Sequence, residues 1–157
     1  MRQINYIFID SDCQNDDGKS GCHALSNFGY HFVVNSEGNI TKYTDIKKSV
    51  HFIPGPIYAP DKYDSCSICI RYCGNLAHDM ELSTFNSRTD SKLSTLNSKL
   101  SKLIDLLVDL RQHFPEAKIL GLDEIKPETW NLKPGTRGVI RPSDAMNVLR
   151  RELSNYP

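Results

Sequence analysis

The stretch TDSKLSTLNSKLSKLIDLLVDLRQHFPEAKILG, residues 89–121, contains the two elements that decide the fold class. Apolar residues recur in it every three or four positions, the spacing of one face of an α-helix: Leu93, Leu96, Leu100, Leu103, Ile104, Leu107, Leu110 and Phe114. Thr89 fits an N-cap, and Pro115 ends the helix. The run AKILG (117–121) that follows is typical of a short buried strand. A long amphipathic helix leading into a strand predicts an α/β fold.

Further strands and one more helix are expected outside this stretch. The β-branched and aromatic run INYIFI (4–9) predicts a strand, YHFVVNSEGNITKY (30–43) predicts two strands around the turn SEG, and CSICIRY (66–72) predicts a fourth. A short helix is expected from Ser143, burying Met146, Leu149 and Leu153. No repeat or linker interrupts the pattern, so residues 1–157 are expected to form a single domain. Two irregular stretches, 53–64 and 125–138, are rich in proline, glycine and aromatics and are expected to line or cover a site.

The charge balance limits the classes of partner. Lysine plus arginine and aspartate plus glutamate each number 19, so no basic surplus exists to neutralise a nucleic-acid backbone. Asp10 interrupts the first apolar run, which is therefore too short for a secretory signal or a membrane span. We expect a cytoplasmic protein with no long nucleic-acid and no membrane partner. Its five cysteines are an odd number, and no structural disulfide is expected in a reducing compartment.

Several blocks of the chain, taken in order, resemble one known family. They are INYIFID, FGYHFVVNSEGNI, SVHFIPG, SICIRYCGNL, SRTDSKLSTLNSKLSKLIDLL, FPEAKILGLDE and RPSDA. They are similar to successive blocks of the N-acetylmuramoyl-L-alanine amidase family, which includes phage lysozymes and peptidoglycan-recognition proteins, and the similarity runs from residue 2 to about 145. The resemblance implies an amidase-like α/β domain, with a mixed β-sheet flanked by helices and a cleft across one face.

The resemblance also identifies three positions where the family holds zinc. Three side chains bind the ion and leave a fourth position for the water that attacks the amide. At these positions this chain has Asp10, Leu122 and, before Pro142, Arg141. Leucine cannot ligate, and a protonated guanidinium repels a cation. The sequence therefore predicts no metal, no cofactor and no hydrolytic activity; the alternative is a zinc-dependent amidase with displaced ligands, for which Asp123 or Glu124 would serve.

Two further residues of the family's cleft are retained. Tyr30 matches the tyrosine that lies beside the metal, and His51 matches a histidine of the cleft wall. Each also has a structural interpretation, Tyr30 as an aromatic that fills space above the sheet and His51 as a histidine at a strand end. His31 alternates to the opposite face from Tyr30 and is expected in the core.

Three other groups of residues have some features of a metal site. Cys66 and Cys69 would face opposite sides of a strand, and Cys69 and Cys73 would lie about 13 Å apart at roughly 3.3 Å per residue, so these cysteines do not chelate. Cys13, Cys22 and His23 are more typical of small buried groups than of a metal site. DSDCQNDDG (10–18) is similar to a calcium loop, but its glycine is misplaced and the closing glutamate is missing.

A fold that has lost its metal keeps its concavity for binding. We therefore expect a non-catalytic protein that sequesters a small anionic ligand, with Asp10, Tyr30, His51, Glu124 and Arg141 as the binding residues. Arg141 offers a fork of donors for carboxylate or phosphate, although Asp10 or Glu124 would, in a purely structural role, neutralise it. The leading candidate is a nucleotide immune signal held in phage counter-defence, and the alternatives are recognition of peptidoglycan fragments and a protein-binding inhibitor.

Overall fold

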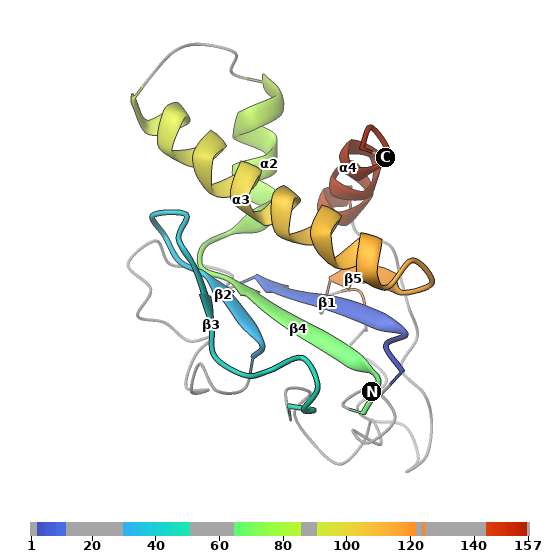
Figure 1. Ribbon diagram of the computed structural model, residues 1–157. Coiled ribbons are helices and arrows are strands. Elements are labelled where there is room, and N and C mark those ends of the chain that lie inside the picture. Colours follow the sequence, from blue (N-terminus) through green and yellow to red (C-terminus); the bar gives the residue numbers. More distant parts are fainter. Residues whose placement is uncertain are drawn as a thin grey trace, which may run out of the picture.

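The computed structural model describes residues 3–11, 30–50, 65–85, 91–121, 124 and 144–156. Its centre is one mixed sheet with the strand order β3-β2-β4-β1-β5 (Figure 1). The strands are β1 (Tyr6–Ser11), β2 (Phe32–Val34), β3 (Ile40–Lys42), β4 (Ser67–Tyr72) and β5 (Lys118–Gly121). β1 runs parallel to both β4 and β5, β2 runs parallel to β4, and β2 and β3 pair in the antiparallel direction. The carboxyl ends of β1, β2, β4 and β5 therefore point the same way.

The described helices lie together on one face of this sheet (Figure 1). They are α2 (Leu76–Phe85), α3 (Ser91–His113) and α4 (Asp144–Leu153). Their apolar faces pack on alternate residues of the central strands, such as Ile7, Ile9, Ile68 and Ile70. This packing forms the larger core, and we call this face of the sheet the helix side.

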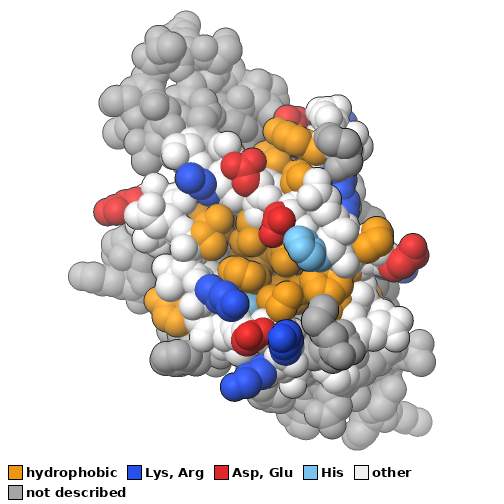
Figure 2. Space-filling model, viewed as in Figure 1, with side chains coloured by type: hydrophobic (Ala, Val, Ile, Leu, Met, Phe, Trp, Pro, Cys, Tyr) orange, Lys and Arg blue, Asp and Glu red, His pale blue; other side chains and the backbone are white. Residues whose placement is uncertain are grey.

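The helix-side core reaches the molecular surface along α3. Partly buried apolar residues flank it there, among them Phe32, Ile46, Ile104 and Val108. Figure 2 shows apolar side chains gathered across the middle of this view, with charged side chains around them. These residues form the partly exposed edge of the helix-side core.

A second apolar cluster occupies the opposite face of the sheet. It contains Phe8 of β1, Cys69 of β4 and Leu120 of β5, together with Tyr30, Val33 and Val50. Phe8 and Cys69 alternate with the isoleucines of the helix side, as successive residues of a strand must. We call this the open side, because the helices among the described residues all pack on the other face.

Most predicted elements are confirmed, with bounds that are shorter or, for the first strand, two residues further along the chain. The strands expected at 4–9, 66–72 and 117–121 are β1, β4 and β5, and the hairpin expected within 30–43 is β2–β3. In its turn Gly38 has a φ of 89°, and the Asn35 side-chain oxygen accepts hydrogen bonds from the backbone N–H groups of Glu37 and Asn39. The helix expected from Ser143 is α4, and its Met146, Leu149 and Leu153 are buried.

Helix α2 was not predicted from the sequence. Leu76 and Met80 are its buried apolar residues, as far as its side chains are described, so it lacks the apolar stripe that reveals α3. Its start is marked by Asn75, whose side-chain oxygen accepts a hydrogen bond from the backbone N–H of His78. An asparagine cap without a periodic apolar face is too weak a signal to predict a helix.

In the part of the chain that the structure describes, α3 and the other helices are too short or too polar to cross a bilayer.

Candidate functional site

Asp10 and Arg71 lie side by side at the carboxyl end of the sheet. The register of β1 and β4 pairs Asp10 with Arg71, as it pairs Phe8 with Cys69 two residues earlier. Both side chains therefore project to the open side, and both residues are partly exposed. In open α/β sheets, ligands bind outside the carboxyl ends of parallel strands. Asp10 and Arg71 occupy such a position.

Tyr30 joins these two residues from the segment that precedes β2. Its side chain is buried, and its hydroxyl donates a hydrogen bond of 2.5 Å to Oδ2 of Asp10. The guanidinium carbon of Arg71 lies 6.0 Å from the centre of the Tyr30 ring, at the outer limit of a cation–π contact. We call Asp10, Tyr30 and Arg71 the carboxyl-end cluster.

The electrostatics of the cluster keep Tyr30 protonated. Burial of the phenol raises its pKa far above the ordinary value, and the charge of Asp10 together with the hydrogen bond to Asp10 raises it further. The positive charge of Arg71 opposes these effects without outweighing them. Tyr30 is therefore a hydrogen-bond donor to a carboxylate, and Asp10 and Arg71 carry the formal charges of the cluster.

Two of these three residues were expected from the sequence, and Arg71 was missed. The structure brings Asp10 and Tyr30, which the resemblance places at the cleft, into direct contact. One feature of the sequence could have indicated Arg71: in a strand, Arg71 lies between Cys69 and Cys73 on the same face. Its approach to Asp10 depends on the register between strands far apart in sequence, which no local pattern reveals.

Glu124 has a different partner from the one considered in the sequence analysis. The sequence predicts that it binds a ligand or neutralises Arg141; in the structure it is fully buried, and Arg150 of α4 holds both carboxylate oxygens, at 2.8 Å and 2.9 Å. Glu124 also accepts a hydrogen bond of 2.8 Å from the backbone N–H of Gly121. This bidentate pair fixes α4 to the end of β5 and gives Glu124 a structural role.

The other predicted site residues lie outside the described residues. These are His51, Leu122 and Arg141, together with Asp123, Cys13, Cys22 and His23 from the alternatives. His31 is described and is in the core as expected: it is fully buried, its Nδ1 accepts a hydrogen bond from the backbone N–H of Cys69, and its Nε2 lies 2.7 Å from the carbonyl oxygen of Lys48.

Three cysteines that could act as metal donors lie among the described residues. Cys66, Cys69 and Cys73 form no disulfide among the described residues, and Cys69 is buried. In these ranges no three histidine, cysteine, aspartate or glutamate side chains gather closely enough to hold a metal ion.

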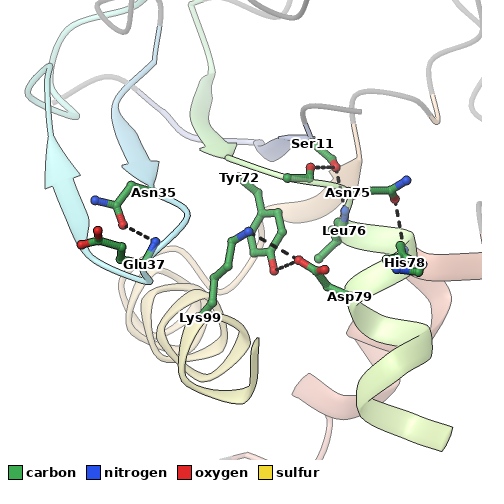
Figure 3. Close-up of polar contacts among 10 residues, drawn as sticks. Ser11, Asn35, Glu37, Tyr72, Asn75, Leu76, His78, Asp79 and Lys99 are labelled. Carbon is green, nitrogen blue, oxygen red and sulfur yellow. Dashed lines mark hydrogen bonds and ion pairs between the residues drawn. The ribbon is translucent and has the colours of Figure 1, made fainter. Parts of the chain in front are cut away.

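A second polar cluster lies on the helix side (Figure 3). The hydroxyl of Tyr72 donates a hydrogen bond of 2.6 Å to Oδ2 of Asp79, and the Lys99 ammonium lies 3.5 Å from the same oxygen and 4.3 Å from the centre of the Tyr72 ring. These three residues are at most 7% exposed, so the cluster lies in the core. A Cβ atom on Gly74 would come within 2.6 Å of the Lys99 ammonium, so glycine leaves the space that the lysine fills. This cluster joins β4, α2 and α3 and is structural.

Comparison with known proteins identifies the fold. No protein-family model and no curated protein matches the chain. Among solved structures it is similar to the N-acetylmuramoyl-L-alanine amidase LysC from Clostridium intestinale URNW, with 13% identity and a TM-score of 0.55, covering 98% of this chain and 87% of that one. It is also similar to the endolysine N-acetylmuramoyl-L-alanine amidase LysCS from the same organism, with 14% identity and a TM-score of 0.57, covering 98% of this chain and 85% of that one.

The chain has the N-acetylmuramoyl-L-alanine amidase fold. The amidase-like fold expected from the resemblance is therefore confirmed, as an α/β domain built on a mixed five-stranded sheet with helices. At this level of identity, the likeness establishes the amidase fold and leaves activity to be argued from the side chains.

Proposed function

We propose that this protein is a zinc-free, non-catalytic protein with the amidase fold, and that it binds and sequesters a small anionic ligand at the carboxyl end of its sheet. The observation that carries the proposal is the hydrogen bond from Tyr30 to Asp10 beside Arg71. The carboxylate at the first expected ligand position is engaged by a phenol, and the neighbouring strand position holds a permanent cation.

The residues at the expected zinc positions do not fit the metal. A catalytic zinc needs three protein donors that are neutral or anionic. Oδ2 of Asp10 already accepts the Tyr30 hydroxyl, and Arg71 lies on the adjacent strand in the same register position. Leu122 has no donor atom, and the guanidinium of Arg141 repels a cation. This donor set supports binding of an anion and does not support metal-assisted hydrolysis.

The anion would be held by donors from several segments. Arg141 and His51 are proposed to approach from the loops that the resemblance places at the cleft. Tyr30 is buried, and it is proposed to support the site from beneath through its hydrogen bond to Asp10. The zero formal charge of the chain favours a small anionic metabolite or nucleotide signal over a long nucleic acid. A cytoplasmic location and a role in phage counter-defence complete this proposal.

A second candidate follows from the fold itself. The matched structures are named as N-acetylmuramoyl-L-alanine amidases and extend over 98% of this chain. A protein that keeps this fold without hydrolysis is suited to recognise a peptidoglycan fragment by binding the carboxylates of that fragment. The same likeness to amidases would support a zinc-dependent amidase with displaced zinc ligands if the protein were found to bind zinc.

One preparation of the protein tests these candidates. The purified chain is analysed for zinc, then denatured by heat, and the released small molecules are identified by mass spectrometry. A nucleotide or another phosphorylated metabolite supports the leading proposal, and a muropeptide supports the second candidate. About one zinc per chain, with peptidoglycan lysis that a chelator abolishes, would overturn both and restore the amidase reaction.

A further inference from the structure

We infer that Arg71 is the residue that binds the ligand's oxyanion, and that Asp10 is a positioning residue that holds Tyr30 beside it. This inference rests on the proposed function and gives it a ligand chemistry. The group recognised is a carboxylate or phosphate that accepts two parallel N–H bonds from one guanidinium.

The position of Arg71 is fixed by the sheet. It lies on the central strand β4, next to Asp10 of β1, and neighbouring strands are about 4.8 Å apart. β4 is hydrogen-bonded to β1 on one side and to β2 on the other, so its backbone is held on both sides. A charge placed on such a strand is held more precisely than one placed on a loop.

The contact with Tyr30 limits where the guanidinium can go. Its central carbon lies 6.0 Å from the ring centre, and the ring is itself held by the hydrogen bond from Tyr30 to Asp10. A guanidinium has five N–H donors in one plane. A bidentate oxyanion uses two of these donors, so one guanidinium can contact a ring and protein acceptors as well as an oxyanion. Arg71 as a residue is partly exposed, while the Nε atom of its guanidinium is buried.

The same geometry gives Asp10 a role that opposes the ligand's charge. Its carboxylate orients the Tyr30 hydroxyl, and it also places a negative charge one strand away from Arg71. An asparagine would keep an oxygen able to accept the Tyr30 hydroxyl while removing that charge. Replacing Asp10 by asparagine should therefore strengthen the binding of an anion. If Asp10 contacted a ligand cation or a metal, the same change would weaken binding.

The test is calorimetric titration of the full-length chain, freed of any co-purified ligand, with inorganic pyrophosphate and with muramyl dipeptide. The variants are Arg71→Gln, Arg71→Lys and Asp10→Asn, with Arg151→Gln as a matched loss of one positive charge on an exposed part of α4. Arg71→Gln should weaken the binding of the preferred probe roughly tenfold to a hundredfold. Arg71→Lys should recover part of that loss, since lysine supplies a charge without the bidentate fork. Asp10→Asn should strengthen binding roughly threefold to tenfold, and Arg151→Gln should leave it unchanged.

The outcomes separate this inference from the proposed function. Binding that survives Arg71→Gln undiminished, in a variant whose circular dichroism matches that of the parent, overturns the assignment of Arg71 and leaves the proposed function standing. Weaker binding by Asp10→Asn overturns the positioning role of Asp10. A parent protein that binds neither probe overturns the proposed function and this inference together. Preference for pyrophosphate or for the dipeptide identifies phosphate or carboxylate as the group recognised.

Discussion

On each face of the sheet, one buried tyrosine donates a hydrogen bond from its hydroxyl to a carboxylate. Tyr30 donates to Asp10 on the open side, and Tyr72 donates to Asp79 on the helix side. Burial is the first cause that raises the pKa of each phenol above its ordinary value, and the neighbouring carboxylate adds to it. Both phenols therefore stay protonated in the folded protein at a pH where exposed tyrosines ionise.

This leads to a prediction about alkaline pH. Unfolded tyrosines lose their protons near pH 10, whereas folded Tyr30 and Tyr72 retain theirs. Their stabilising contribution is therefore fully present below about pH 10 and is lost as the pH rises above it. Ultraviolet titration of the seven tyrosines should show that Tyr30 and Tyr72 ionise only as the protein unfolds. A Tyr72→Phe variant serves as the comparison, and a smooth titration of all tyrosines before unfolding would contradict the prediction.

The pair of Glu124 and Arg150 gives a second prediction at this scale. Arg150→Ala would leave the carboxylate of Glu124 buried without its cation, and breaking a buried pair costs about 3 kcal/mol, a figure at the low end because the Arg150 side chain is 30% exposed. The free energy of unfolding in urea measures the loss. Arg151→Ala removes an exposed neighbouring arginine and should change stability by less than about 0.5 kcal/mol. Equal effects of the two variants would show that the ion pair contributes nothing.

At the scale of elements, α3 holds the helix side of the sheet together. Leu103 and Leu107 are fully buried in its apolar stripe, while Lys102 and Asp105 on its other face are exposed. The amphipathic pattern of the sequence therefore corresponds to a real division between core and solvent in this part of the helix.

Truncation of this stripe should be costly. Replacing Leu103 or Leu107 by alanine removes buried methyl groups and leaves a cavity, which lowers the free energy of unfolding by about 2 to 5 kcal/mol. Lys102→Ala is the matched change on the exposed face, and it should have little effect. A loss below about 0.5 kcal/mol for either leucine would mean that the stripe does not pack in the core.

For the whole molecule, the proposed function predicts that stability does not depend on a metal. A ligand that binds only the folded state raises its stability according to its concentration and affinity. If no zinc is bound, an excess of chelator should shift the melting temperature by less than about 1 °C, and added zinc should not raise it. Differential scanning calorimetry with and without chelator checks this. A fall of several degrees that zinc reverses would show that the protein binds zinc after all.

The sequence alone determined the α/β class, the main strands, and the helices α3 and α4. Those features depend on local periodicity, because the spacing between neighbouring apolar residues shows which face of a helix or strand they share. The same reasoning missed α2, whose described side chains show too few apolar residues to form a stripe. The resemblance to amidases added Asp10 and Tyr30 as neighbours in the site.

Only the tertiary structure decided which charges meet. Arg71 lies beside Asp10 because β1 and β4 pair in one particular register, and a shift of one residue would have turned Arg71 to the helix side. Glu124 is held by Arg150 because α4 returns to the end of β5. Both contacts join residues widely separated along the chain. Their geometry is set by strand order and by packing across the whole sheet, so it cannot be predicted from the spacing of residues in the sequence.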